Sequence, residues 1–93
     1  MFVVAARCDL HLPGAGSLKG KRAILNRLKD RLRNATAAAV AEVEHNELWQ
    51  RAALGVAVVS SEAGHAEELL QAARRIVESD PDAVVLDWHV ERY

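Results

Sequence analysis

The segment LPGAGSLKGKR, residues 12–22, contains the residue types that hold a phosphate: glycines, a hydroxyl side chain and cations. A nucleotide-binding P-loop needs a glycine, any four residues, and then Gly-Lys followed by Ser or Thr. Gly20 and Lys21 supply the central pair, but the first glycine position holds Ala15 and the hydroxyl position holds Arg22. Because the motif fails at two positions, a nucleotide-hydrolysing P-loop is excluded.

The same segment predicts the start of a helix capped by Ser17. Lys19, Lys21 and Arg22 then lie in its first turn, where each cation opposes the helix dipole at a cost of about 0.3–1 kcal/mol. The second predicted helix obeys the usual rule, with acidic residues early and cations late: Glu62, Glu67, Glu68, Arg74 and Arg75. A rule broken in one helix and kept in the other is typical of a functional site.

Lys21 falls on the apolar side of the first predicted helix, and long helical side chains lean toward the N-terminus. We therefore expect its ammonium to point back at residues 13–17, where free backbone N–H groups of the helix start converge. Together these groups would bind one phosphate or carboxylate. The alternative is that Lys21 only extends past the edge of the core into solvent.

The cations of the chain are concentrated in this helix. Seven of the twelve Lys and Arg residues lie between Lys19 and Arg33, which gives this stretch a formal charge of +6 against −7 for the rest. Arg22, Asn26, Lys29 and Arg33 line one flank over roughly 16 Å, enough to follow a phosphate backbone. A solvated charged face is the alternative, although such faces usually mix signs. The predicted nucleic-acid or anion-binding residues are Ser17, Lys19, Lys21, Arg22, Lys29 and Arg33.

The sequence offers no recognisable catalytic set. Asp9, His11, Asp87 and His89 are possible metal ligands if the first and last strands are neighbours, but no close ligand motif such as HExxH or CxxC is present. Cys8 lies on the inward face of its strand, which favours a small core residue over a nucleophile. We expect a non-enzymatic protein with no cofactor and no metal.

The elements that would position these residues follow from periodicity. Strands are predicted over residues 2–12, 39–44, 51–59 and 84–90, with Val84, Leu86, Trp88 and Val90 as the inner face of the last one. Helices are predicted from residue 18 to a stop at Asn34, and from a cap at Ser60 or Ser61 to residue 79. The order β-α-β-β-α-β over residues 1–93 predicts one α+β domain, a ferredoxin-like sandwich with a four-stranded antiparallel sheet and both helices on one face.

The opposite sheet face is expected to be open. The two central strands would present small or charged side chains there: Val3, Ala5, Arg7, Asp9, His11, Arg51, Ala53, Gly55, Ala57 and Val59. RRM domains share this topology but stack bases on aromatic residues of those strands, and none is present here. The apolar part of this face instead predicts packing against a protein surface, including a second copy of the chain. Trp49 and Trp88 are expected in the core or in such an interface.

The composition indicates a cytoplasmic protein. Cys8 is the single cysteine, which suits a reducing compartment. The N-terminus has no basic start and too short an apolar run for a signal peptide. No apolar stretch approaches the roughly 20 residues of a membrane span, so no membrane partner is expected.

Two segments, LHLPGAGSLKGKR and VAEVEHNELWQRAALGVAVVS, and the helices between and after them resemble the YlxP-like family of small bacterial proteins of undefined function. The match covers nearly the whole chain. The resemblance implies the ferredoxin-like fold and no established activity. Members are often encoded beside translation and ribosome-maturation genes, which points to ribosomal RNA.

Three hypotheses follow. The first is a non-enzymatic RNA- or ribosome-associated module that uses the first helix and its N-terminal loop. The second is a homo-oligomer, formed through the open sheet face, that binds a small anionic ligand or a protein partner. The third is an enzyme whose site is shared between subunits.

Overall fold

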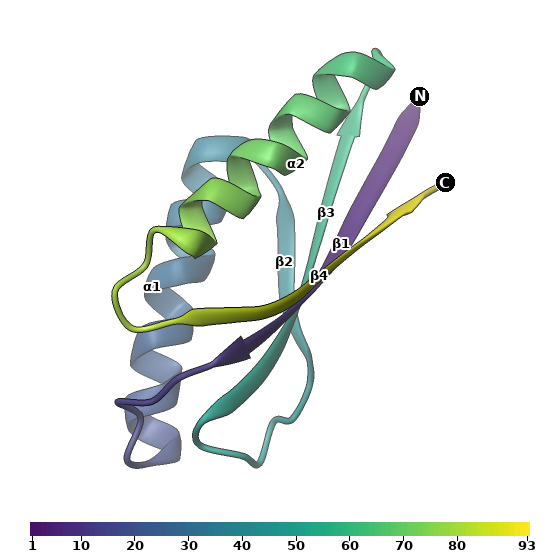
Figure 1. Ribbon diagram of the computed structural model, residues 1–93. Helices are drawn as coiled ribbons and strands as arrows, with labels where there is room; N and C mark the ends of the chain where they lie inside the picture. The colour runs from purple at the N-terminus through teal and green to yellow at the C-terminus, as the bar shows by residue number, and fades with distance from the viewer.

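The computed structural model describes all 93 residues and has six elements (Figure 1). They are β1 (Phe2–His11), α1 (Leu18–Thr36), β2 (Ala39–Glu44), β3 (Arg51–Ser60), α2 (Ala63–Glu78) and β4 (Val84–Arg92). The sheet has the order β2-β3-β1-β4 and every neighbouring pair is antiparallel. The predicted ferredoxin-like sandwich is confirmed.

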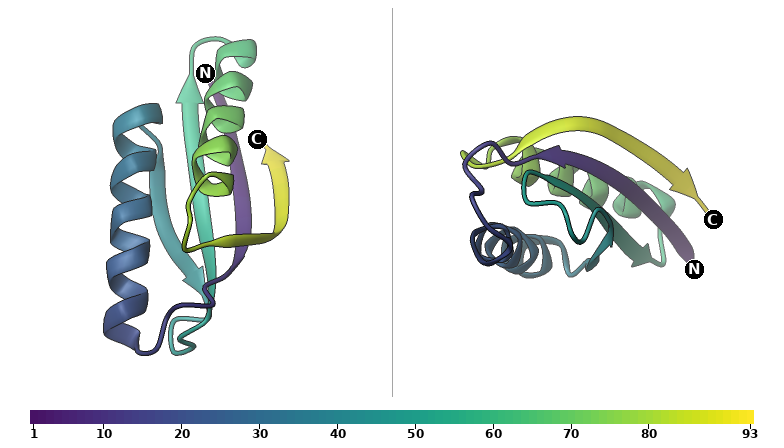
Figure 2. Two further views of the ribbon diagram at one scale, coloured as in Figure 1. Left: turned by 60° about the vertical axis from the view of Figure 1, so that its left-hand side comes forward. Right: turned by 90° about the horizontal axis from the view of Figure 1, so that it is seen from below.

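Both helices pack on the same face of the twisted sheet (Figure 2). Helix α1 runs beside the edge strand β2, while α2 lies over β1 and β3 and also contacts β4. The connection before α1 and the β2–β3 loop lie at the same end of the molecule, near the start of α1. No helix is long and apolar enough to cross a membrane.

The core lies between the sheet and the helices. The inward residues of β1 and β3 alternate as predicted, and each helix adds one apolar stripe. The members of the two stripes are Leu25, Leu28 and Leu32 in α1 and Ala66, Leu70, Ala73 and Val77 in α2. All of these side chains are fully buried or nearly so.

The predicted inner face of β4 is wrong at its first two positions. A register shift lies between the pairs Asp9–Asp87 and Leu10–Val85, so Leu86 is an additional residue in a bulge. One additional residue moves the preceding side chains to the opposite face. Val84 and Leu86 are therefore about half exposed, while Val85, Trp88 and Val90 pack against the core.

One predicted boundary of each helix is corrected by the structure: the end of α1 and the start of α2. Helix α1 continues two residues past Asn34 and ends where Ala37 adopts a left-handed conformation (φ 56°, ψ 24°). Helix α2 has Glu62 at its N-cap with no side-chain cap bond, and its first turn has no acidic residue. The Ser60 hydroxyl accepts a hydrogen bond from the Glu62 N–H (3.1 Å), one residue before the helix begins. The contrast between the two helix starts is therefore weaker than the sequence indicated.

Ala37 is a site where glycine should stabilise the protein. An L-residue in the left-handed region is strained by its Cβ, and glycine is not. We expect Ala37→Gly to raise the free energy of unfolding by up to about 1 kcal/mol, measured by urea denaturation. Ala35→Gly, at an exposed position inside the same helix, is the matched control and should lower it by about 0.5–1 kcal/mol. Equal losses in the two variants would contradict the left-handed cap.

Candidate functional site

Lys21 is buried, with 1 % of its surface exposed, and its ammonium lies inside the protein. Nζ donates hydrogen bonds to the carbonyl oxygens of His45 and Leu48, both at 2.7 Å. The carboxylate oxygen Oε2 of Glu42 lies 2.7 Å from Nζ as an ion pair without an aligned hydrogen bond. The expectation that this ammonium points at residues 13–17 is wrong, and so is the solvent-directed alternative.

The reason for the difference is the position of the β2–β3 loop. Residues 45–48 of the loop lie within reach of the ammonium and offer two carbonyl acceptors. An ammonium has three N–H groups. Two of them are donated to carbonyls and the charge is paired with the Glu42 carboxylate, so the buried Lys21 ammonium is not available to an external anion. It holds the β2–β3 loop against α1 instead.

The predicted loop before α1 is a helix start, as the simpler interpretation of the sequence had it. The Ser17 backbone is extended, and its hydroxyl accepts from the Gly20 N–H at 3.0 Å. The Gln50 amide donates to the carbonyl oxygens of Pro13 and Ala15, at 3.3 and 3.4 Å. Ala15 itself is buried. The 13–17 loop is therefore pinned to the end of the β2–β3 loop.

Two of the predicted cations of α1 are used to hold the α2–β4 connection. Arg27 pairs with Asp80 and Asp82, each at 3.0 Å, and Arg31 lies 3.5 Å from Asp80. The Asp80 carboxylate is completely buried and also accepts from the Asp82 N–H at 2.9 Å. Neither arginine belongs to the predicted site, and both lie on a different side of α1 from Arg22, Lys29 and Arg33.

Four exposed or half-buried cations remain on the other flank of α1. Lys19, Arg22 and Lys29 have no hydrogen-bond or ion-pair partner within the chain, whereas Arg33 donates to the Val40 carbonyl at 3.0 Å and lies 4.0 Å from Asp30. At 100° per residue these four side chains occupy an arc of about 80°, and they span about 21 Å along the axis. We call Lys19, Arg22, Lys29 and Arg33 the basic flank. The Arg33–Val40 bond places it on the β2 side of the molecule.

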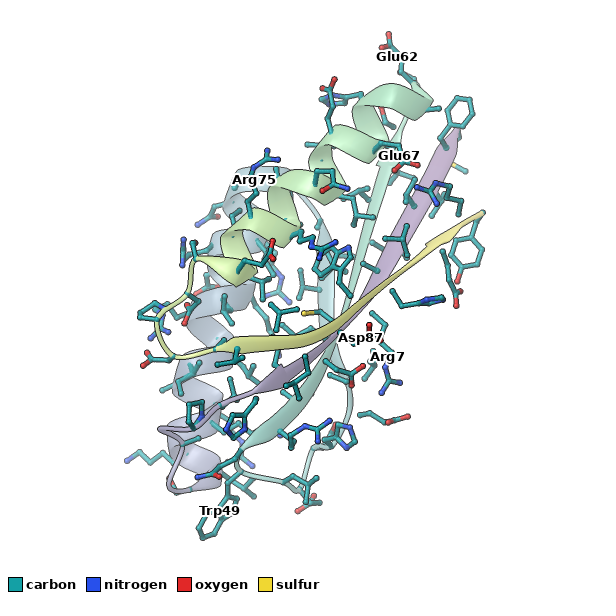
Figure 3. The ribbon with its side chains drawn as sticks, viewed as in Figure 1. Arg7, Trp49, Glu62, Glu67, Arg75 and Asp87 are labelled. Carbon is teal, nitrogen blue, oxygen red and sulfur yellow. The ribbon has the colours of Figure 1, made fainter.

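Trp49 lies outside the core, so of its two predicted placements, core or interface, only the interface stays a prediction. It is 52 % exposed and neighbours Leu48, which is 50 % exposed, on the β2–β3 loop. Figure 3 shows Trp49 projecting from the end of the molecule where α1 begins. The sequence does carry a signal, because Leu48 and Trp49 lie between the polar pairs Asn46-Glu47 and Gln50-Arg51 rather than in an apolar alternation. Trp88, by contrast, packs against the core, with the Arg74 guanidinium 5.9 Å from its ring centroid.

The charged part of the open sheet face is an ion-pair cluster. Arg7 donates to Asp9 (3.2 Å) and to Glu44 (2.9 Å), and His45 Nε2 lies 3.7 Å from Glu44. The hydrogen bonds from Arg7 are the main reason that the pKa values of both carboxyl groups are lowered. Arg7 and Asp87 lie on the same part of this face in Figure 3.

The four candidate metal ligands are not brought together as a site. Asp9 is engaged by Arg7, the Nδ1 of His11 lies 3.1 Å from the Gln50 carbonyl oxygen, and His89 lies 3.6 Å from Glu91. No group of three or more His, Cys, Asp or Glu side chains is arranged to hold a metal ion. Burial raises the pKa of the Cys8 thiol to about 12, so this group is protonated at neutral pH.

The apolar part of the open face is a depression formed by small residues. Its outward lining includes Ala5, Ala39, Ala41, Gly55 and Ala57. The nearby Val59 is 58 % exposed. The central strands β1 and β3 present no aromatic side chain at their outward positions from Val3 to His11 and from Arg51 to Val59, so this face offers no RRM-type stacking surface.

By its architecture the chain is a ferredoxin-like α+β sandwich. Two solved structures share this fold: the de novo designed protein LFR1 1, described as having a ferredoxin fold (TM-score 0.63, 16 % identity, 98 % of this chain and 86 % of that one), and the de novo designed protein Foldit4 (TM-score 0.57, 14 % identity, 100 % and 97 %). At these identities the likeness concerns the fold alone.

The chain belongs to the family described as "Protein of unknown function (DUF503)", whose model matches residues 3–90. It is 36 % identical over 77 residues to the uncharacterized protein YlxP of Bacillus subtilis (strain 168), a match that covers 83 % of this chain and 84 % of that protein. The resemblance to the YlxP-like family is confirmed. Neither finding carries an activity.

Lys21→Met should destabilise the fold. Methionine keeps most of the apolar stem but leaves a partly buried carboxylate and two carbonyls without their cation, and breaking a buried pair costs about 3–5 kcal/mol. We expect a loss of about 3 kcal/mol or more in the free energy of unfolding, measured by urea denaturation. Lys19→Met makes the same chemical change at an exposed position and should change it by less than about 0.5 kcal/mol. Similar values for the two variants would contradict the structural role of Lys21.

Proposed function

We propose that this protein is a non-enzymatic RNA-binding module, associated with ribosomal or other structured RNA, that contacts phosphates through the basic flank of α1. The observation that carries the proposal is that the cations of this helix fall into two groups, one engaged within the protein and one without partners. Lys21, Arg27 and Arg31 are engaged within the protein, whereas Lys19, Arg22 and Lys29 have no partner and lie in line.

Unpaired cations in line are suited to phosphates. Each can neutralise one phosphate and release the counterion bound to it. The flank is about 21 Å long, so several phosphates of one strand fit along it. Arg33, at the far end, is partly engaged, because Nη2 donates to the Val40 carbonyl and Nη1 lies 4.0 Å from Asp30, so it supports the flank less than the three unpaired cations. Ser17 supports the site by capping the helix from which Lys19 and Arg22 project.

The charge of the remaining surface favours a defined orientation of the RNA. The chain has a net charge of −1, so the positive stretch from Lys19 to Arg33 is balanced by acidic residues elsewhere. A polyanion is attracted to α1 and repelled by the rest of the surface. Binding should therefore occur at this flank rather than over the whole protein.

Arg22→Gln and Lys29→Gln test the proposal. Each removes one unpaired charge, so affinity for ribosomal RNA fragments should fall by about fivefold. The slope of log affinity against log salt concentration should shrink by about 0.7–0.9 for each phosphate that the variant no longer neutralises. The measurement is a titration at several salt concentrations. Arg75→Gln, at an exposed arginine of α2, is the matched control and should leave both quantities unchanged. Equal effects of all three variants would argue against a site on α1.

A second candidate is a homodimer formed through the open sheet face. Its support is the depression lined by Ala5, Ala39, Ala41, Gly55 and Ala57, since small side chains let two surfaces approach closely. The exposed Val59 extends the same apolar area. A symmetric dimer covers such a patch with its own copy.

Ala57→Glu tests the dimer. It places a carboxylate in the centre of the apolar area, where a close copy would bury the charge at high cost. We expect sedimentation to show a dimer for the wild type and a monomer for the variant. A wild-type protein that sediments as a monomer at micromolar concentration would refute this candidate.

A further inference from the structure

We propose that Trp49 is a stacking platform for an unpaired nucleobase, so that the RNA bound by the basic flank is single-stranded where it reaches the start of α1. The inference rests on the proposed function and names the form of RNA that the site selects. Trp49 is exposed, and the protein holds the loop that carries it in place by hydrogen bonds on both sides.

The backbone around Trp49 is pinned before and after it. The Leu48 carbonyl accepts from the buried Lys21 ammonium at 2.7 Å. The Gln50 carbonyl accepts from the Leu12 N–H at 2.9 Å and lies 3.1 Å from the Nδ1 of His11. The Gln50 side chain is bonded in turn to the 13–17 loop. The loop therefore holds the backbone of Trp49 in place while leaving its side chain 52 % exposed.

This arrangement is better explained by positioning than by stability. A buried ammonium stabilises a fold little, because its desolvation offsets much of its attraction to the acceptors. An exposed indole contributes little to the core. What the arrangement does achieve is a fixed backbone on both sides of the aromatic residue, and a backbone that is already ordered lowers the entropy lost when a ligand binds.

Charged groups around the indole favour a nucleotide. Trp49 lines a shallow hollow with Glu47, Leu48, Gln50 and Arg51, and Arg51 is exposed with no ion-pair partner. Arg51 can contact the phosphate of a base stacked on Trp49. Glu47 repels a phosphate but can accept a hydrogen bond from a base amino group. A base in the hollow with its phosphate toward Arg51 satisfies both residues.

The position of Trp49 connects this hollow to the basic flank. The loop that carries it is bonded to Pro13, Ala15 and Lys21, so the hollow lies at the N-terminal end of α1. Around the helix axis Arg22 lies about 100° from Lys21 and Lys19 about 160°, so Arg22 is the flank residue nearer to the loop. Figure 3 shows Trp49 at this end of the molecule. A strand whose phosphates follow the flank can thus place a base on Trp49. Stacking needs an unpaired base, because a base in a duplex already has both faces covered.

The experiment uses the full chain with Trp88→Phe, which leaves Trp49 as the single tryptophan. A mixed-sequence 12-nucleotide RNA and a duplex of the same sequence are titrated at several salt concentrations, and indole fluorescence and affinity are recorded. We expect the single strand to quench Trp49 and the duplex to leave it unquenched. Trp49→Ala should weaken single-strand binding about fivefold or more without changing duplex binding or the salt slope. Trp49→Phe should restore most of the affinity.

The outcomes separate this inference from the proposed function. If the single strand leaves Trp49 unquenched and Trp49→Ala binds it as tightly as the parent, the stacking site is refuted. The RNA proposal survives that result if Arg22→Gln still weakens binding. If neither RNA binds in a salt-dependent way, the proposed function is refuted and this inference with it. Urea denaturation should show that Trp49→Ala leaves the free energy of unfolding unchanged.

Discussion

The buried ammonium of Lys21 is the interaction on which one end of the molecule depends. It joins the first turn of α1 to the end of β2 through Glu42, and to two carbonyls that lie 24 and 27 residues further along the chain. A charge in this position costs several kcal/mol unless its acceptors surround it. The helix start, the edge of the sheet and the β2–β3 loop must therefore take up their positions together, and the exposed Trp49 is placed as a result.

Helix α1 divides its residues among three tasks. One side supplies Leu25, Leu28 and Leu32 to the core, and a second pairs Arg27 and Arg31 with the buried Asp80. Only the third side, the basic flank, faces solvent with unpaired charge. The excess of cations in this helix is thus partly structural, because Asp80 and Glu42 require them. A count of charges along the chain overstates the number of cations available to a ligand.

The fold could be predicted because periodicity is a local property. The alternation in β1 and β3 and the stripes of both helices are readable from neighbouring residues, and so is the order of the elements. Two features were not local. The bulge at Leu86 arises from pairing with β1 and reverses the faces of Val84 and Leu86. The 100° spacing of helical residues correctly placed Lys21 on the core side of α1. Its acceptors, however, come from the β2–β3 loop, which lies far along the chain and cannot be read from this spacing. Of the predicted site, Lys19, Arg22 and Lys29 remain free and Arg33 partly so, while Lys21 is withdrawn from it.

Cys8 gives the protein a built-in reporter of its own opening. The thiol lies in β1 between β3 and β4, is completely buried, and stays protonated because burial raises its pKa to about 12. Alkylating reagents attack the thiolate of an accessible cysteine. They can reach this one only when the core between the sheet and the helices opens, so loosening of the terminal residues or of the β2–β3 loop does not expose it. The rate of thiol labelling in native buffer therefore follows the opening of the core, in a chain with no second cysteine to complicate the signal.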